Sequence, residues 1–147
     1  GILINEHKQV LVSDELIRGM YITKFPGGGL ELGEGTRDCL KREFMEEMNL
    51  NVEIGEHIYT TDFYQMSAFN NAQQIISIYY FAKALEPIKA PLRNTAFDFD
   101  EQQLRVYNET GETETFRFIN RDEVSEETVS LPIDKLVVNL LKEKGII

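Results

Sequence analysis

The chain has 147 residues, of which 42% are apolar, and its 25 acidic and 15 basic residues give a formal net charge of -10. This length and composition fit one globular domain with a core of its own, and the charge argues against binding to duplex nucleic acid or to an anionic membrane, because both need a positive surface. No run approaches 18 consecutive apolar residues and no basic segment followed by an apolar one opens the chain, so we expect neither a transmembrane helix nor a signal peptide.

The first half of the chain predicts strands on both sides of one helix. Apolar alternation and β-branched residues predict three short strands, near residues 2–4, 10–12 and 20–22. A helix is predicted from Thr36 to about Asn49, after a glycine-rich loop. Further strands are predicted within residues 51–64, with a break at Gly55, and within residues 73–85, which carry the strongest strand pattern. Together these elements imply a sheet.

In the second half of the chain, a segment with little secondary-structure signal is followed by a clear strand and helix pattern. Between residues 86 and 113 prolines punctuate the chain, and only a short strand at residues 104–107 is predicted. A connection of this length is usually functional or disordered. A strand returns at residues 115–119, and a helix over residues 132–144 carries five apolar residues at the spacing of one buried stripe: Ile133, Leu136, Val137, Leu140 and Leu141. We expect this last helix to cover one face of the sheet.

The helix predicted at residues 36–49 carries three carboxylates, Glu43, Glu46 and Glu47, on one strip about 100° wide. Apolar residues border the strip and are predicted to enter the core: Leu40, Phe44 and Met48. Like charges three and four residues apart repel, and Glu46 and Glu47 also lie at the negative end of the helix dipole. A divalent cation would relieve both effects, and oxygen ligands suit Mg²⁺, Mn²⁺ or Ca²⁺. The alternative is a solvated charged face, which is common for such runs.

The loop before this helix, "PGGGLELGEG" at residues 26–35, contains five glycines in ten residues. Such a backbone can adopt φ > 0 or approach a ligand without intervening side chains. A glycine-rich loop alone is also found in ordinary turns. Loop and acidic helix together indicate a functional site.

Residues 28–50, "GGLELGEGTRDCLKREFMEEMNL", resemble the box of the Nudix hydrolases: Gly, five residues, Glu, seven residues, Arg-Glu, an aliphatic or aromatic residue, any residue, Glu-Glu, any residue, Gly and an aliphatic residue. Every charged position fits. The one departure is Asn49, where the family has a glycine that would close the helix in a left-handed conformation, and Asn tolerates that conformation next best. The resemblance implies an α/β fold, the Nudix α/β/α sandwich with a mixed β-sheet, formed as a single Nudix domain over residues 1–147.

Carried over position by position, the resemblance implies the metal ligands Glu43, Glu46 and Glu47, with Glu34 and a backbone carbonyl near Gly28 as further ligands. It also implies that Arg42 orients these carboxylates and does not touch the substrate. The implied general base is a carboxylate, and the candidates are Glu46 and Glu47 in the box and Glu112, Glu114 and, further off, Glu101 outside it. We place Glu114 first because it directly abuts the predicted strand at residues 115–119.

Several aromatic residues flank the box and are candidates for stacking on a nucleoside: Tyr21, Phe25, Phe63, Tyr64 and Phe69. Most residues of this kind belong to the core, so the sequence does not single one out. His7 and His57 are isolated in the sequence, and we assign them no chemistry.

The resemblance implies metal-dependent hydrolysis of a nucleoside diphosphate linked to another moiety, such as a nucleotide, a nucleotide sugar or ADP-ribose. Mg²⁺ is the implied cofactor, with Mn²⁺ as the alternative. Two other functions on the same fold stay open. A regulatory domain would bind a nucleotide sugar or ADP-ribose without reaction, although the intact acids count against it. A diphosphate isomerase would need metal-binding histidines and a further catalytic cysteine.

The expected partner is therefore a small nucleoside diphosphate derivative, with no nucleic acid and no membrane. A homodimer is also open, because dimers are frequent in similar proteins. The single cysteine, Cys39, cannot form an internal disulfide, so a cytoplasmic location is the default expectation.

Overall fold

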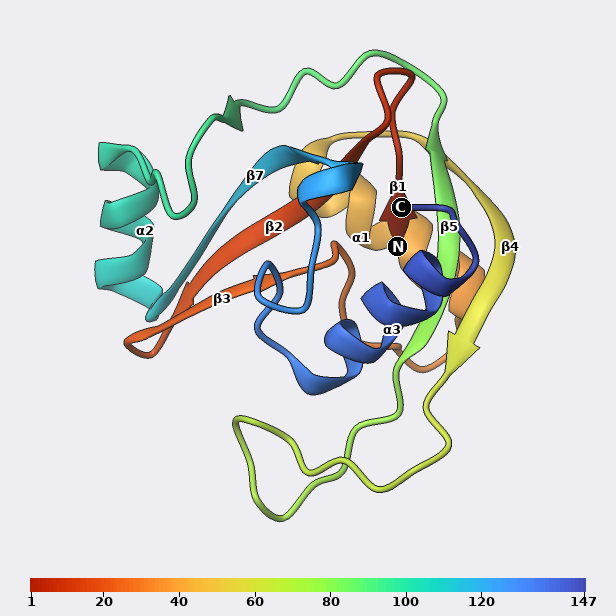
Figure 1. Cartoon of the computed structure of the whole chain (residues 1–147). Helices are drawn as coiled ribbons and strands as arrows, with labels where there is room; N and C mark the ends of the chain where they lie inside the picture. The colour runs from red at the N-terminus through yellow and green to blue at the C-terminus, as the bar shows by residue number, and fades with distance from the viewer.

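The computed structural model describes all 147 residues, folded into seven strands and three α-helices (Figure 1). The strands are β1 (Ile2–Leu3), β2 (Gln9–Ile17), β3 (Met20–Lys24), β4 (Val52–Thr60), β5 (Ile78–Ala84), β6 (Leu92–Arg93) and β7 (Glu112–Asn120). The helices are α1 (Thr36–Met48), α2 (Glu101–Thr110) and α3 (Pro132–Glu143), and a 3-10 turn (Arg121–Glu123) follows β7. None of the three helices has the length and apolarity that a membrane span requires.

The strands form two small mixed sheets. One has the order β1-β5-β4, with β1 parallel to β5, and the other has the order β3-β2-β7-β6, with β6 parallel to β7. The remaining pairs are antiparallel, and a single bridge between Ile4 and Val10 joins β1 to β2. Figure 1 shows α1 and α3 on opposite sides of these strands. The predicted α/β sandwich with mixed strand directions is confirmed.

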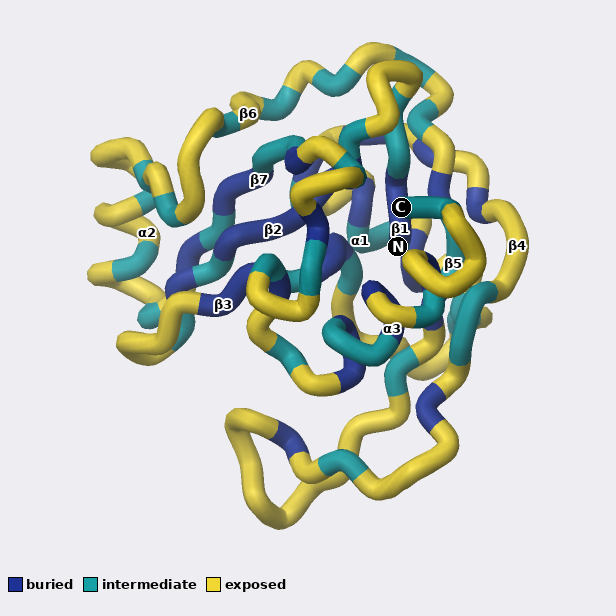
Figure 2. Tube along the Cα trace, viewed as in Figure 1, coloured by how far each residue is buried: buried dark blue, intermediate teal, exposed yellow.

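Alternating side chains divide the core between the two helices, as strand geometry requires. Ile2, Val10 and Val12 pack with α3, whereas Leu3 and Leu11 pack with α1. The α1 residues predicted to be buried are buried: Leu40, Phe44 and Met48. In Figure 2 the dark buried trace follows β2 and its neighbours, while the loop between β4 and β5 is mostly exposed.

Helix α3 covers one face, as predicted, but its buried stripe is shifted. Its buried side chains are Ile133, Asp134, Val137, Val138 and Leu141. Leu136 and Leu140, predicted to belong to the stripe, are only half-buried. Asp134 enters the core because the hydroxyl of Tyr79 donates a hydrogen bond of 2.6 Å to its Oδ1.

Helix α1 ends where the sequence predicted. Asn49 adopts the left-handed conformation with φ 49° and ψ 45°, its backbone N–H donates to the Met45 carbonyl, and the N–H of Leu50 donates to the Phe44 carbonyl. Asn49 therefore closes the helix as a glycine would. The last turn contains no basic residue, so Glu46 and Glu47 meet the negative helix end without compensation.

Strand β2 is longer than the predicted residues 10–12, because its polar second half also pairs with β3 and β7. Asp14 is fully buried and accepts hydrogen bonds from Arg117, at 2.6 and 3.2 Å, and from the Thr23 hydroxyl at 2.6 Å. A buried carboxylate needs such partners. The partners lie in β7 and β3, so a local sequence pattern does not reveal them.

One prediction in the middle of the chain is wrong. Residues 104–107 lie in helix α2 instead of a strand, and this helix begins with a capping box in which Asp100 and Gln103 exchange hydrogen bonds. The strand predicted within residues 73–85 is present as β5, but it begins only at Ile78. The break predicted at Gly55 is confirmed, because the β4–β5 register shifts between Ile54 and His57.

Candidate active site

The second sheet presents a polar wall toward α1. Ser13 and Glu15 alternate with buried residues of β2 and share the face of Leu11, which packs with α1. Lys24 of β3 lies opposite Ser13, and Glu114 of β7 lies opposite Glu15. Residues that pair across antiparallel strands share a face. The wall therefore carries two carboxylates, one lysine and one hydroxyl.

Arg42 of α1 organises the box carboxylates on one side of the site. Its Nε and Nη2 donate to the two oxygens of Glu34 at 3.0 and 2.7 Å, and its Nη1 donates to Glu43 at 2.8 Å and to Glu46 at 3.1 Å. Nη2 also donates to the Gly29 carbonyl at 3.0 Å. Hydrogen bonding to the Arg42 guanidinium lowers the pKa of Glu34 to about 2.

Gly28 leaves space for the present position of the Glu43 side chain. A Cβ atom on Gly28 would overlap the Glu43 carboxyl group, so a larger residue would force that carboxyl group to move. The Cys39 thiol lies beside this loop, 3.5 Å from the Gly29 carbonyl. Burial raises the pKa of Cys39 to about 11, so the thiol is not a nucleophile at neutral pH.

Glu47 and Glu114 occupy the other side of the site, between α1 and the sheet. Burial, reinforced by the charge of Glu114, raises the pKa of Glu47 to about 8. Burial also raises the pKa of Glu114 to about 7, against the effects of a Ser13 hydrogen bond and of Lys24. Oε2 of Glu47 is buried and has no hydrogen-bond partner. The protein partners on this side of the site therefore do not fully stabilise the ionised forms of these two carboxyl groups.

Glu15 and Lys24 belong to the site although the sequence did not point to them. The Lys24 ammonium lies 2.9 Å from Glu15 and donates to the Gly27 carbonyl at 2.8 Å. Burial opposes its charge, but the Glu15 carboxylate outweighs burial and raises the pKa of Lys24. The signal that could have revealed the pair is the hairpin register, which places β2 and β3 residues on one face.

Two other candidate bases lie outside this cluster. Glu112 opens β7, two residues before Glu114, and its exposed side chain makes no hydrogen bond or ion pair. Glu101 is exposed in the first turn of α2. Of the candidates outside the box, the structure brings only Glu114 next to the box carboxylates.

The aromatic candidates are not gathered around the acids. Tyr21 lies opposite Leu16 on the other face of the sheet, where its ring contacts Phe97 at 5.1 Å. Phe25 is 4% exposed and packs in the core cluster with α3, which gives it no free face for a nucleoside. Phe63 and Phe69 are exposed on the loop between β4 and β5.

The acids fit a hard cation in their chemistry, but they do not form a ready-made cage. No group of three or more His, Cys, Asp and Glu side chains is arranged to hold a metal ion. Two observations still support a cation here. The Oε2 of Glu47 has no partner and could serve as an oxygen ligand, and Gly28 lets the backbone approach the carboxylate of Glu43 closely.

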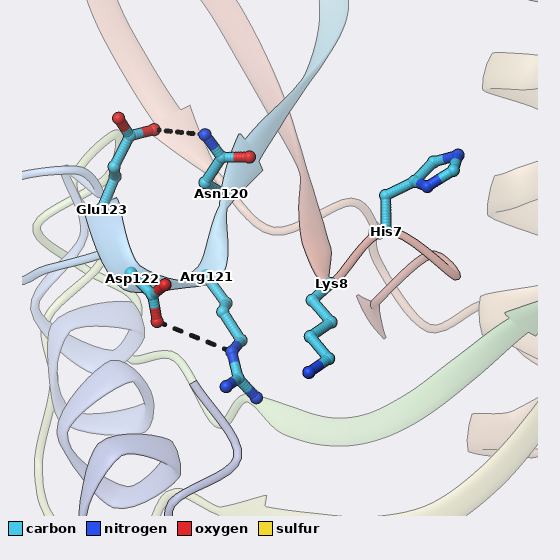
Figure 3. Close-up of a pocket in the computed structure, with 6 residues that line it drawn as sticks. All are labelled: His7, Lys8, Asn120, Arg121, Asp122 and Glu123. Atoms are coloured by element: carbon cyan, nitrogen blue, oxygen red, sulfur yellow. Dashed lines mark hydrogen bonds and ion pairs between the residues drawn. The ribbon is translucent and has the colours of Figure 1, made fainter.

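A hollow on the surface lies elsewhere, where β2 begins and β7 ends (Figure 3). Its lining is entirely polar: His7, Lys8, Asn120, Arg121, Asp122 and Glu123. Asn120 pairs with Gln9, six residues along β2 from Glu15, or about 20 Å at strand spacing. This hollow is separate from the acidic site and has no apolar wall for a base.

Comparison with known proteins places the chain among related domains. The NUDIX domain matches residues 1–140. A NUDIX hydrolase structure from Nitrosomonas europaea is 15% identical, with a TM-score of 0.67 over 97% of this chain and 85% of that chain. An ADP-ribose pyrophosphatase from Streptococcus suis is 18% identical, with a TM-score of 0.57 over 98% and 87%. A UDP-X diphosphatase is 16% identical, with a TM-score of 0.61 over 98% of this chain and 60% of that chain. At these identities the likeness shows the fold. No curated protein matches the sequence.

Proposed function

Because the chain belongs to the NUDIX family and is a Nudix pyrophosphohydrolase, we propose that it uses Mg²⁺ to hydrolyse a nucleoside diphosphate linked to another moiety. A nucleotide, a nucleotide sugar or ADP-ribose would meet this description. The observation that carries the proposal is the junction of Glu47 from the box with Glu114 from β7, where a buried carboxylate oxygen has no partner.

The carboxylates of α1 would hold the metal ion. Glu47 offers its free oxygen, and Glu43 and Glu46 would complete the set with Glu34 and the Gly28 carbonyl as further ligands. Oxygen ligands of this kind suit Mg²⁺, and Mn²⁺ is the natural substitute. When bound, the ion would neutralise phosphate oxygens and lower the pKa of a bound water.

The net charge of -10 supports the requirement for a cation. A pyrophosphate is a polyanion, and a surface with clustered carboxylates repels it. Arg42 is engaged with Glu34, Glu43 and Glu46, so it acts on the carboxylates and is not free to receive a phosphate. Its role in this proposal is to orient the box acids.

Glu114 is our candidate for the general base. A water molecule attacks phosphorus, the bond from phosphorus to the bridging oxygen breaks, and the proton of the water passes to Glu114. A base works best with a pKa near the working pH, and the pKa of Glu114 is raised to about 7. Its hydrogen bond from Ser13 would hold the carboxylate in place for this transfer.

The substrate class is supported by the titles of two structural neighbours, one an ADP-ribose pyrophosphatase and the other a UDP-X diphosphatase. The two titles name UDP-X and ADP-ribose as the compounds on which those proteins act. The moiety itself is left to experiment, because the aromatic candidates Tyr21 and Phe25 face away from the acids.

A substrate panel with Mg²⁺ tests the proposal. ADP-ribose, nucleotide sugars and dinucleoside polyphosphates should each be incubated with the protein and a phosphatase, which releases phosphate only from the monoesters that cleavage produces. We expect turnover of at least one compound, a strong loss in Glu46→Gln and Glu47→Gln, and little change in Glu53→Gln, an exposed β4 residue. Absence of turnover throughout the panel, or full activity in both box variants, would refute it.

A further inference from the structure

Lys24 links two parts of the site that are separate in the fold. It lies at the end of β3, and its side chain is only 18% exposed. Its ammonium contacts the Glu15 carboxylate of β2 at 2.9 Å and the Gly27 carbonyl of the glycine-rich loop at 2.8 Å. One cation therefore ties the sheet to the loop that precedes α1.

Lys24 contacts the peptide group between Gly27 and Gly28, and the Glu43 side chain packs next to this peptide. Gly27 has φ +148°, in the region that favours glycine, and the following residue, Gly28, lies against the Glu43 carboxyl group with no room for a Cβ. The position of this loop therefore bears on the position of the Glu43 carboxylate. The contact from Lys24 to the Gly27 carbonyl fixes the loop at this point.

Lys24 also differs from Arg42 in the number of acids that it engages. Arg42 pairs with four carboxylates of residues 28–50, whereas Lys24 pairs only with Glu15. Its charge acts on Glu47 and Glu114 without a direct ion pair, lowering the pKa of each against the effect of burial. Glu15 is thus held by Lys24, while Glu47 keeps its free oxygen.

We propose that Lys24 is a positioning residue of this site, which fixes the Gly27–Gly28 peptide against Glu43 and restrains Glu15, so that Glu47 and Glu114 are left without an ion-pair partner. The proposal rests on the proposed function and assigns Lys24 no contact with the substrate. Partners that lie behind metal ligands typically change metal affinity or activity by about 10- to 100-fold when they are removed.

The test uses four variants of the full chain. Lys24→Met removes both contacts, Lys24→Arg keeps the charge, and Glu15→Gln removes the ion pair but leaves the contact with the Gly27 carbonyl. Lys89→Met is the matched control, because it removes the same charge from an exposed residue outside the site. Three quantities are measured: kcat and KM on the best substrate of the panel, Mn²⁺ binding by electron paramagnetic resonance, and the amide signals of ¹⁵N-labelled glycines.

We expect Lys24→Met to lower kcat by about 10- to 100-fold with KM changed by less than about threefold. Loss of a nearby positive charge should by itself tighten Mn²⁺ binding. Loss of the contact between Lys24 and the Gly27 carbonyl should instead weaken it. We expect Mn²⁺ binding to weaken by about tenfold, glycine signals of the loop to shift, and Lys24→Arg to restore most of the lost kcat. Lys89→Met should match the parent protein in all three measurements.

Three results would overturn the proposal. A rise in KM of more than about tenfold with kcat preserved would mean that Lys24 binds substrate directly. Tighter Mn²⁺ binding in Lys24→Met would mean that Lys24 acts only through its charge. Unchanged glycine signals and unchanged Mn²⁺ binding would mean that the Lys24–Glu15 ion pair has no positioning role. If no panel substrate is turned over, the proposed function fails alone, because Mn²⁺ binding and the glycine signals still decide the role of Lys24.

Discussion

The two sides of the acidic site use the same residue type in opposite ways. On the Arg42 side, Glu34, Glu43 and Glu46 accept hydrogen bonds from one guanidinium, and the pKa of Glu34 is lowered to about 2. On the Lys24 side, Glu47 keeps an unpartnered oxygen, and its pKa is raised to about 8. The difference arises because Arg42 donates hydrogen bonds to the first set, whereas burial and the neighbouring charge of Glu114 disfavour the ionised form of Glu47.

The two sides of the site differ even between residues that are adjacent in the sequence. Glu46 and Glu47 are consecutive, yet the first is 59% exposed beside Arg42 and the second points into the junction with the sheet. A satisfied carboxylate contributes to the shape of the site, whereas an unsatisfied one needs a proton or a cation. We infer that the Lys24 side carries the chemistry and that the Arg42 side supports it.

The strongest test of this contrast replaces Glu47. Glu47→Gln should lower kcat/KM by about 10³-fold or more, because the charge stabilisation supplied by a metal site is worth several kcal/mol. Glu46→Gln should have the smaller effect, since Arg42 already pairs with the exposed Glu46. Steady-state kinetics on the same substrate measure both, with thermal unfolding as the check on folding. Equal losses in the two variants would remove the distinction between the sides.

A second test concerns the proton acceptor. Glu114→Gln should lower kcat by about 10²- to 10⁴-fold, which is the usual contribution of a general base. Glu112→Gln is the matched control, because Glu112 lies two residues earlier in β7 with an exposed and unpaired side chain. We expect the control to stay within about threefold of the parent. If Glu112→Gln proved the more damaging variant, the base would have to be reassigned.

A third test weakens the supporting side. Arg42→Lys keeps the charge but loses the planar fork that binds Glu34 with two hydrogen bonds while it contacts Glu43. The Mn²⁺ concentration for half-maximal activity should rise by about 10- to 100-fold. A metal titration of activity measures it. Normal metal dependence in Arg42→Lys would show that the carboxylates are placed without the fork.

The smallest expected effect is the pH dependence of stability in metal-free buffer. The folded-state pKa values of Glu47, about 8, and Glu114, about 7, lie above the unfolded value of 4.5. The folded protein keeps these protons after the unfolded chain has lost them, so stability is full below pH 4.5 and falls as the pH rises toward 8. The Tm should therefore fall from pH 5.5 to pH 8, by about 3 to 6 °C more than in Glu47→Gln.

The contribution of Glu34 to stability should depend on pH in the opposite direction. Its pKa lies below the unfolded value, so its contribution is present above pH 4.5 and is lost as the pH falls toward 2. Glu34→Gln should flatten only this acid limb of the Tm profile. If the two variants altered the same limb of the profile, the opposite environments inferred for the two sides would be wrong.

The sequence predicted the box region in detail because its signals are local. Helix α1 and its end at Asn49 follow from periodicity and from the conformation that Asn tolerates, and both are confirmed. The strand at residues 104–107 was predicted wrongly because Leu104 and Val106 alternate as in a strand, although they lie exposed on α2. The local signal that could have corrected it is the capping box formed by Asp100 and Gln103.

The rest of the site depends on pairing between distant residues. Glu15 and Glu114 lie opposite each other in β2 and β7, with 98 residues of sequence between them. The buried Asp14 likewise depends on Arg117 in β7. No local pattern reports such partners, so the sequence placed Glu114 near the end of a loop and did not point to Glu15 or Lys24. These assignments need the strand register.

Calorimetric titration of Mn²⁺ into the metal-free protein tests the central claim most directly. Metal binding to a carboxylate that still holds its proton releases that proton, and titration in two buffers of different ionisation enthalpy counts it. We expect Mn²⁺ to bind at pH 7 with release of protons, to release fewer at pH 9, and to bind much more weakly to Glu47→Gln. Absence of binding, or equal affinity and proton release in Glu47→Gln, would contradict the assignment of the metal site to the Glu47 side.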